Sequence, residues 1–304
     1  MRLMSVFSTV LVLAVCSLWA AGAAAQELSP RAFWPTPRGT KVLVTGYSYA
    51  FGDVLIDPSL PVYGVDSRIN SAVLAYLQTF SLWGRTANII AEQPYSWGTT
   101  EGILYGEPVN RDLSGFSDFG ITLAVNLYGA PSMTREEFQE FRADPRPVLG
   151  ASLKVVAPTG RYEEDKLLNV GTNRWSVKPE LGYLIPFKRT WVLELEVGAW
   201  FFTNDDDFLT GEREQHPIFS AEAHLVKRIR PGLWASLEAN YYAGGRQVIG
   251  GDPYDDLQRN SRLGGTVVIP FAGRHAIKIG YSTGLLTDKG SDFDQFIVSH
   301  TVAF

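Results

Sequence analysis

The stretch 169–187, NVGTNRWSVKPELGYLIPF, carries the pattern that decides the fold. From position 174 onward its side chains alternate between a polar and an apolar set, and a period of two residues indicates a β-strand. In a soluble barrel the apolar set would fill the core, whereas in an outer-membrane barrel it would contact lipid and the charges would line the lumen. The polar set is Arg174, Ser176, Lys178, Glu180 and Gly182, and the apolar set is Trp175, Val177, Pro179, Leu181, Tyr183 and Ile185.

The N-terminus has the three parts of a secretory signal peptide. Arg2 is followed by an apolar run at 6–20 and by small residues up to Ala25. The run is shorter than the about 20 residues of a membrane-spanning helix, so a membrane anchor is the less favoured alternative. Cleavage is expected after Ala25.

The rest of the chain is expected to form one domain. Cys16 is the only cysteine, so disulfides and thiol chemistry are excluded after cleavage, and the net charge of −5 argues against a nucleic-acid partner. No linker or change of composition divides the chain. We therefore predict a signal peptide at 1–25, a short periplasmic segment at 26–39 and an outer-membrane β-barrel at 40–304.

Alternating runs with turn signals between them predict about 12 strands. Many runs have ten residues or more, whereas soluble strands average about five or six and a tilted membrane strand needs about 9 to 11. Strand length therefore favours the membrane barrel. The predicted strands lie near 40–52, 67–82, 87–100, 116–128, 148–160, 172–186, 190–203, 216–229, 233–245, 260–271, 274–286 and 293–304.

Short and long connections alternate between these strands. Outer-membrane barrels have short periplasmic turns and long extracellular loops. The sequence thus predicts an all-β fold, a transmembrane antiparallel up-and-down barrel in the outer membrane of a Gram-negative bacterium. The long loops are expected at 53–66, 101–115, 161–171, 204–215 and 246–259.

One connection on the periplasmic side predicts a short helix. Thr134 and Glu137 have the spacing of a capping box, and Phe138 and Phe141 follow three residues apart. We expect an amphipathic helix that covers the periplasmic rim. A gating role is the less favoured alternative.

The alternation of the opening stretch continues in the following strands and gathers charges on one face. If that face lines the lumen, opposed charges would form a constriction that selects solutes by its field and width. The alternative is that the charges brace the wall in salt-bridge ladders. In 67–82 both faces carry apolar residues, which predicts a partly apolar lumen there. The lumen candidates are Arg174, Lys178, Glu180, Glu194, Glu196, Glu222, Glu238 and Lys278.

The chain ends in an aromatic residue with alternating apolar residues upstream, apart from His300. This pattern resembles the signal by which outer-membrane barrels are recognised for insertion. It predicts the barrel-insertion machinery as a partner, besides outer-membrane lipid, lipopolysaccharide and a small-molecule solute. The predicted insertion residues are Phe304, Val302, Val298 and Phe296.

The sequence contains no pattern for catalysis or cofactor binding. Ser299 and His300 are neighbours on a predicted strand and point to opposite faces. Neither G-x-S-x-G nor H-E-x-x-H occurs, and the glycine-rich stretch 244–251 lies in a predicted loop with no following helix. We predict no catalytic residue and no cofactor, and therefore not an enzyme.

Two histidines near Glu222 raise the question of a metal site. His216 and His224 share a face of one strand, but eight residues separate them by roughly 26 Å at about 3.3 Å per residue. They cannot bind one ion within that strand. The acidic run 205–207 is expected to be solvated, with ions that bridge lipopolysaccharide as the alternative, so no metal ligand is predicted.

Several long motifs resemble one family across nearly the whole mature chain. These are VVAPTGRYEEDKLLNVGTNRWSVKPELGYLIPF at 155–187, WFFTNDDDF at 200–208, YSYAFGDVLIDPSLPV at 47–62 and SLWGR at 81–85. They are similar to the family of transporters of the meta-pathway of phenol degradation, which is related to functional-amyloid secretion pores.

The resemblance implies an outer-membrane barrel that takes up small aromatic or hydrophobic compounds. The amyloid-exporting branch carries a long coiled-coil extension, for which 26–39 is too short. We therefore expect a transporter or channel for passive passage of small molecules. The alternative is a structural or secretion-type barrel without a small-molecule substrate.

Overall fold

The computed structural model describes residues 30–54, 63–104, 107–166, 168–208, 211–288 and 291–304. The predicted signal peptide at 1–25 and the first residues of the segment 26–39 lie outside these ranges. Within them, the structure has no helix that is long and apolar enough to cross a membrane.

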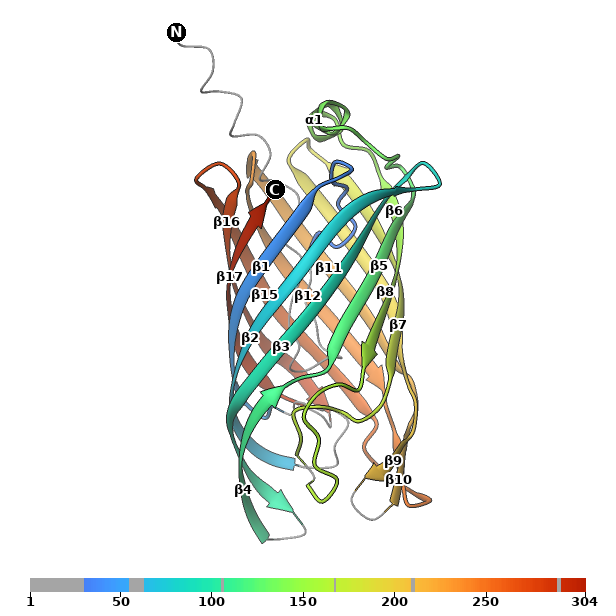
Figure 1. The fold of residues 1–304 in the computed structure, drawn as a ribbon, viewed down its shortest axis with the longest axis vertical. Coiled ribbons are helices and arrows are strands. Elements are labelled where there is room, and N and C mark those ends of the chain that lie inside the picture. The colour runs from blue at the N-terminus through green and yellow to red at the C-terminus, as the bar shows by residue number, and fades with distance from the viewer. Residues whose placement is uncertain (1–29, 55–62, 105–106, 167, 209–210, 289–290) are drawn as a thin grey trace.

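Twelve antiparallel strands form the wall of one barrel (Figure 1). Consecutive wall strands are neighbours, and pairing of the first wall strand with the last one closes the ring. This order follows from the short connections, which join adjacent antiparallel strands. The wall strands are β1 (Lys41–Gly52), β2 (Tyr63–Leu82), β3 (Arg85–Leu104), β5 (Phe119–Tyr128), β6 (Val148–Ala157), β7 (Ser176–Phe187), β8 (Trp191–Phe202), β11 (Ile218–Arg230), β12 (Leu233–Gly244), β15 (Gln258–Phe271), β16 (His275–Asp288) and β17 (Phe293–Ala303).

The twelve predicted strands are confirmed, but three predicted loops contain further strands. The expected loop 101–115 is the end of β3 together with β4 (Glu107–Phe116), which pairs only with β3 and extends the barrel as a hairpin. Its polar residues suggested a loop, although a two-stranded hairpin beyond the membrane also accommodates polar side chains. The other two loops form a small sheet of β9 (Asp205–Phe208), β10 (Gly211–Gln215), β13 (Gln247–Ile249) and β14 (Asp252–Pro253).

The exposure of the opening stretch shows which set of side chains faces inward. Trp175 and Leu181 are 49% and 50% exposed, whereas Arg174 and Lys178 are 2% and 5% exposed. Large apolar side chains are exposed in the same way on strands all around the ring. An apolar outer band with charges inside is the arrangement of a membrane barrel. The apolar set of 169–187 therefore faces lipid.

The periplasmic end of the barrel is filled by the N-terminal segment. Phe33 and Trp34 are buried in an apolar cluster with side chains of the wall and of the helix. A Cβ at Gly150 or Gly182 would lie 2.2 Å or 2.1 Å from the Phe33 ring, so the ring occupies the space that these two glycines leave open. The described part of 26–39 thus enters the lumen instead of lying in the periplasm. This corrects the sequence expectation for 26–39.

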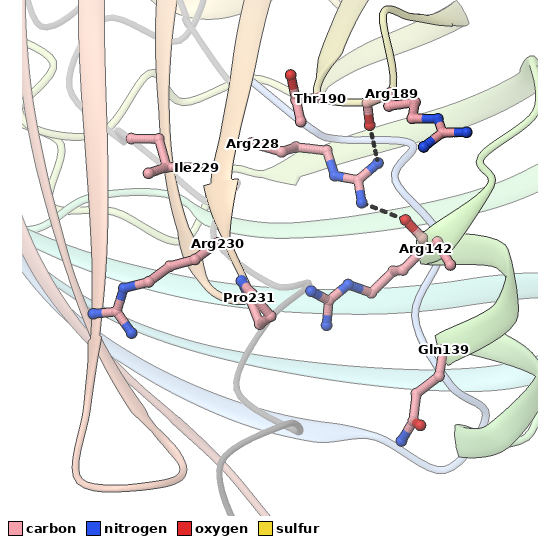
Figure 2. A pocket seen from close by; sticks show the side chains of 9 residues that line it. Gln139, Arg142, Arg189, Thr190, Arg228, Ile229, Arg230 and Pro231 are labelled. Carbon is pink, nitrogen blue, oxygen red and sulfur yellow. Dashed lines mark hydrogen bonds between the residues drawn. The ribbon is translucent and has the colours of Figure 1, made fainter.

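The short helix α1 (Arg135–Ala143) lies at the periplasmic rim as predicted (Figure 1). Both hydrogen bonds of the capping box between Thr134 and Glu137 are present. Phe138 and Phe141 are buried, and the ring of Phe141 meets the ring of Trp34 edge to face at 5.7 Å. The helix therefore packs on the N-terminal segment as well as on the rim. Beside it a pocket of about 470 Å³ opens toward two periplasmic turns (Figure 2).

Candidate functional site: the barrel interior

The charged residues of β8, β11 and β12 form two rows across the inner wall. Glu194 lies opposite His224, and His224 lies opposite Glu238 on the next strand. Glu196 lies opposite Glu222 in the adjacent row. Directly opposite residues of an antiparallel pair have Cβ atoms about 4.5–5.5 Å apart, so the register alone brings four carboxylates of this wall together.

Lys178 on β7 supplies positive charge to this wall. Its Nζ lies 2.5 Å from a carboxylate oxygen of Glu180 and 3.3 Å from Glu222. The hydroxyl of Tyr242 donates to Glu222 at 3.4 Å. Lys178, Glu222 and Tyr242 are buried, so their charges and hydrogen bonds are largely shielded from solvent. The arrangement is a packed ion-pair network and not a ring of charges around open water.

Glu194 also holds the N-terminal segment. The backbone N–H of Arg31 donates a hydrogen bond to Glu194. The guanidinium of Arg31 lies 4.7 Å and 5.1 Å from the ring centres of Trp34 and Trp234. The segment is therefore attached both to the charged wall and to the apolar cluster below it.

Two of the predicted lumen residues lie away from this network. Arg174 donates to Gln215 at 2.5 Å and its guanidinium lies 4.4 Å from the ring centre of Phe202, near the extracellular end. Lys278 is buried on β16, where its register neighbours are Val268 and Ser299. The structure thus brings together the glutamates and Lys178, whereas these two belong to other parts of the interior.

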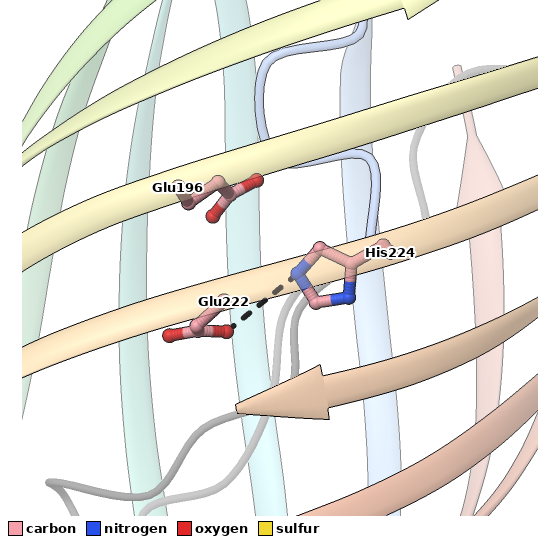
Figure 3. Close-up of side chains that lie close together, drawn as sticks. All are labelled: Glu196, Glu222 and His224. Carbon is pink, nitrogen blue, oxygen red and sulfur yellow. Dashed lines mark ion pairs between the residues drawn. The ribbon is translucent and has the colours of Figure 1, made fainter. Parts of the chain in front are cut away.

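Glu196, Glu222 and His224 are the residues of the described chain that could hold a metal ion (Figure 3). One ligand atom from each lies within 4.8 Å of the others. Nε2 of His224 lies 3.6 Å from a carboxylate oxygen of Glu222, and Lys178 also pairs with Glu222. We therefore interpret the cluster as part of the ion-pair network. His216 is exposed at the extracellular side, far from this cluster.

The wall formed by β1, β2 and β3 has an apolar stretch on its inner face, next to the buried ion pair of Glu92 and Lys154 at 2.8 Å. In the ring of twelve strands β2 lies six strands from β11, so this wall stands opposite the charged one. The expectation of a partly apolar lumen near 67–82 is confirmed. The inner side chains are Val42, Val44, Val73, Ala75, Leu77 and Ile90.

At the extracellular mouth the acidic run 205–207 is not solvated throughout. Asp205 is fully buried, with a carboxylate oxygen 3.3 Å from Arg213, and it accepts hydrogen bonds from Tyr162 and Asn173. Asp206 and Asp207 are exposed as expected. Asp205 therefore joins the small sheet to the connection between β6 and β7.

Asp53 and Asp292, two carboxyl groups at the extracellular mouth, make the stability of the barrel depend on pH. Asp53 follows β1 beyond the wall, and burial, followed by the charge of Asp292, raises the pKa of Asp53 from 3.8 to about 6. The folded state thus binds this proton more tightly than the unfolded state, so stability falls as pH rises from about 4 to about 6. Asp53→Asn should raise the urea midpoint at pH 7 and leave it unchanged at pH 3. Tryptophan fluorescence measures this, and equal midpoints for both proteins at pH 7 would contradict it.

The closed barrel, with lipid-facing apolar side chains and a charged interior, defines an outer-membrane β-barrel. An outer membrane channel from Pseudomonas putida F1 is similar with a TM-score of 0.74 and 20% identity over 91% of this chain and 100% of that one. The beta domain of the Bordetella autotransporter BrkA is similar with a TM-score of 0.51 and 11% identity, over 88% of this chain and 100% of that one. These identities show the fold alone.

The sequence identifies the family more closely than these structures do. Residues 25–290 match the family described as "Putative MetA-pathway of phenol degradation", and the chain belongs to it. This confirms the resemblance in the motifs at 155–187 and 200–208. None of the curated proteins compared with the chain matches it.

Proposed function

We propose that the protein is a passive outer-membrane channel for small molecules with an apolar body and a polar or charged group, such as aromatic acids. The two-sided interior carries the proposal. The inner side chains of β1–β3 offer van der Waals contact to an apolar body, and the carboxylates and Lys178 on the opposite wall offer ionic contact to a polar group. Sugars and inorganic ions would gain little from contact with the apolar stretch of β1–β3.

Passage of a solute requires movement of the N-terminal segment, because Phe33 and Trp34 fill the periplasmic end. We propose passage and not turnover, because charged side chains of the described interior pair with one another. The similar protein from Pseudomonas putida F1 is described as an outer membrane channel, which supports the same class of function here.

Flux through the purified barrel tests the proposal. Proteoliposomes should swell faster in isosmotic benzoate than in a sugar of similar mass, and protein-free liposomes provide the control. Equal rates for both solutes would overturn the preference for apolar bodies. Absence of flux for every solute would favour the alternative, a structural or secretion-type barrel.

Insertion through the C-terminal residues stays a prediction. Phe304, Val298 and Phe296 are exposed on the outer face of the barrel, as a recognition signal requires. Partnership with the insertion machinery and with lipopolysaccharide is likewise part of the proposal.

A further inference from the structure

Four arginines line the pocket beside α1 at the periplasmic rim (Figure 2). Arg142 comes from the last turn of α1, Arg189 from the turn between β7 and β8, and Arg228 and Arg230 from the end of β11. No acidic residue lines the pocket, and none of the four arginines forms an ion pair with a carboxylate of the described chain. The remaining lining residues are Gln139, Ala143, Thr190, Ile229 and Pro231.

Arg228 fixes the shape of the pocket. Its guanidinium donates to the backbone carbonyl oxygens of Arg142 and Arg189, and so joins α1 to the β7–β8 turn (Figure 2). The same guanidinium lies 5.0 Å from the ring centre of Trp34. Arg228 is therefore a structural residue of the site, whereas the side chains of Arg142 and Arg230 have no carboxylate partner in the described chain.

Burial and mutual repulsion make the positive charges of this pocket unfavourable. Arg142 is partly buried, and this burial, followed by the charge of Arg228, lowers the pKa of Arg142 to about 10. Exposed guanidiniums on a protein surface are solvated, but these two are held close together with part of their solvation lost. A bound anion would relieve both effects, because guanidiniums form paired, charge-assisted hydrogen bonds with carboxylate and phosphate oxygens.

We propose that this pocket binds the phosphate group of an anionic ligand at the periplasmic rim, beside the N-terminal segment that fills the end of the barrel. Four arginine side chains line a volume that suits a phosphate with part of its attached molecule. Ile229 lies on the lipid-facing side of β11, where it is 55% exposed, so one wall of the pocket continues into the apolar outer band. The phosphate can thus belong to an acidic phospholipid of the periplasmic leaflet or to a soluble compound.

Retention of lipid by the purified barrel tests the site. The protein is refolded with phosphatidylcholine containing cardiolipin, and native mass spectrometry counts the cardiolipin that stays bound. The double variant Arg142→Gln/Arg230→Gln should bind cardiolipin at least roughly tenfold more weakly than the wild type, because it lacks two charge-assisted contacts. Arg135→Gln is the matched control, since Arg135 is exposed on the same helix but does not line the pocket.

Competition by inorganic phosphate distinguishes the two sources. If phosphate displaces cardiolipin from the wild type, the site recognises the phosphate group itself. If cardiolipin stays bound, the site recognises a lipid headgroup. Phosphate binding is measured by calorimetry. The proposal is overturned if the wild type and the double variant bind cardiolipin equally and also bind phosphate equally. The heat-modifiable migration of folded barrels on gels verifies folding, and Arg189→Gln in the exposed turn repeats the test if the double variant fails to fold.

Discussion

Gly182→Ala should open the periplasmic end of the barrel and raise its conductance several-fold. The new Cβ would lie 2.1 Å from Cδ2 and 2.2 Å from Cε2 of Phe33, which is far inside contact distance. An aromatic ring is rigid and Gly182 is fixed within β7, so the ring must leave its place. Overpacking of this kind costs about 1–3 kcal/mol, and each 1.4 kcal/mol changes the occupancy of the inserted segment about tenfold.

Two measurements report the displacement. Single-channel recordings in planar bilayers give the conductance, and trypsin should cut after Arg31, which is buried in the wild type, much faster in the variant. Gly265→Ala is the control, because its Cβ would lie at an ordinary distance of 3.4 Å from the carbonyl oxygen of Ser236. Unchanged conductance together with unchanged cleavage would contradict the idea that the N-terminal segment can leave the periplasmic end.

The sequence predicts the strands of the barrel wall but not the place of the N-terminal segment. The alternation at 174–185 determines the faces of β7 by itself, since strand parity depends only on neighbouring residues. Turn residues and strand length then determine the order of the ring. These local signals predicted twelve strands, the capping box of α1 and the direction of Lys178.

The place of Phe33 depends instead on residues far away in the sequence. Its pocket requires glycines at 150 and 182, on two different strands, and an isolated glycine in a strand carries no sign of what approaches it. The arginine pocket has the same origin, because Arg142 and Arg189 line one pocket only once the ring has closed. The segment 26–39 was expected in the periplasm, and its aromatic pair at Phe33 and Trp34 was the signal that could have indicated burial.

Lys178→Met should both destabilise the barrel and make its lumen more selective for cations. The substitution keeps the length of the side chain but removes the ammonium that lies 2.5 Å from Glu180 and 3.3 Å from Glu222. Removing one partner of a buried ion pair typically costs about 3–5 kcal/mol, because the other charge remains buried without compensation. Glu196, opposite Glu222 in the register, adds a further negative charge to the same place.

The two effects separate the two roles that the lumen charges can have. The urea midpoint, followed by tryptophan fluorescence, measures bracing of the wall, and the reversal potential in a salt gradient measures selection among ions. Lys188→Met is the matched control, since Lys188 lies exposed in the turn that follows the same strand. A lower midpoint with an unchanged reversal potential would assign Lys178 to the wall alone. A shifted reversal potential would mean that the network that holds β7 to β11 also determines which solutes pass.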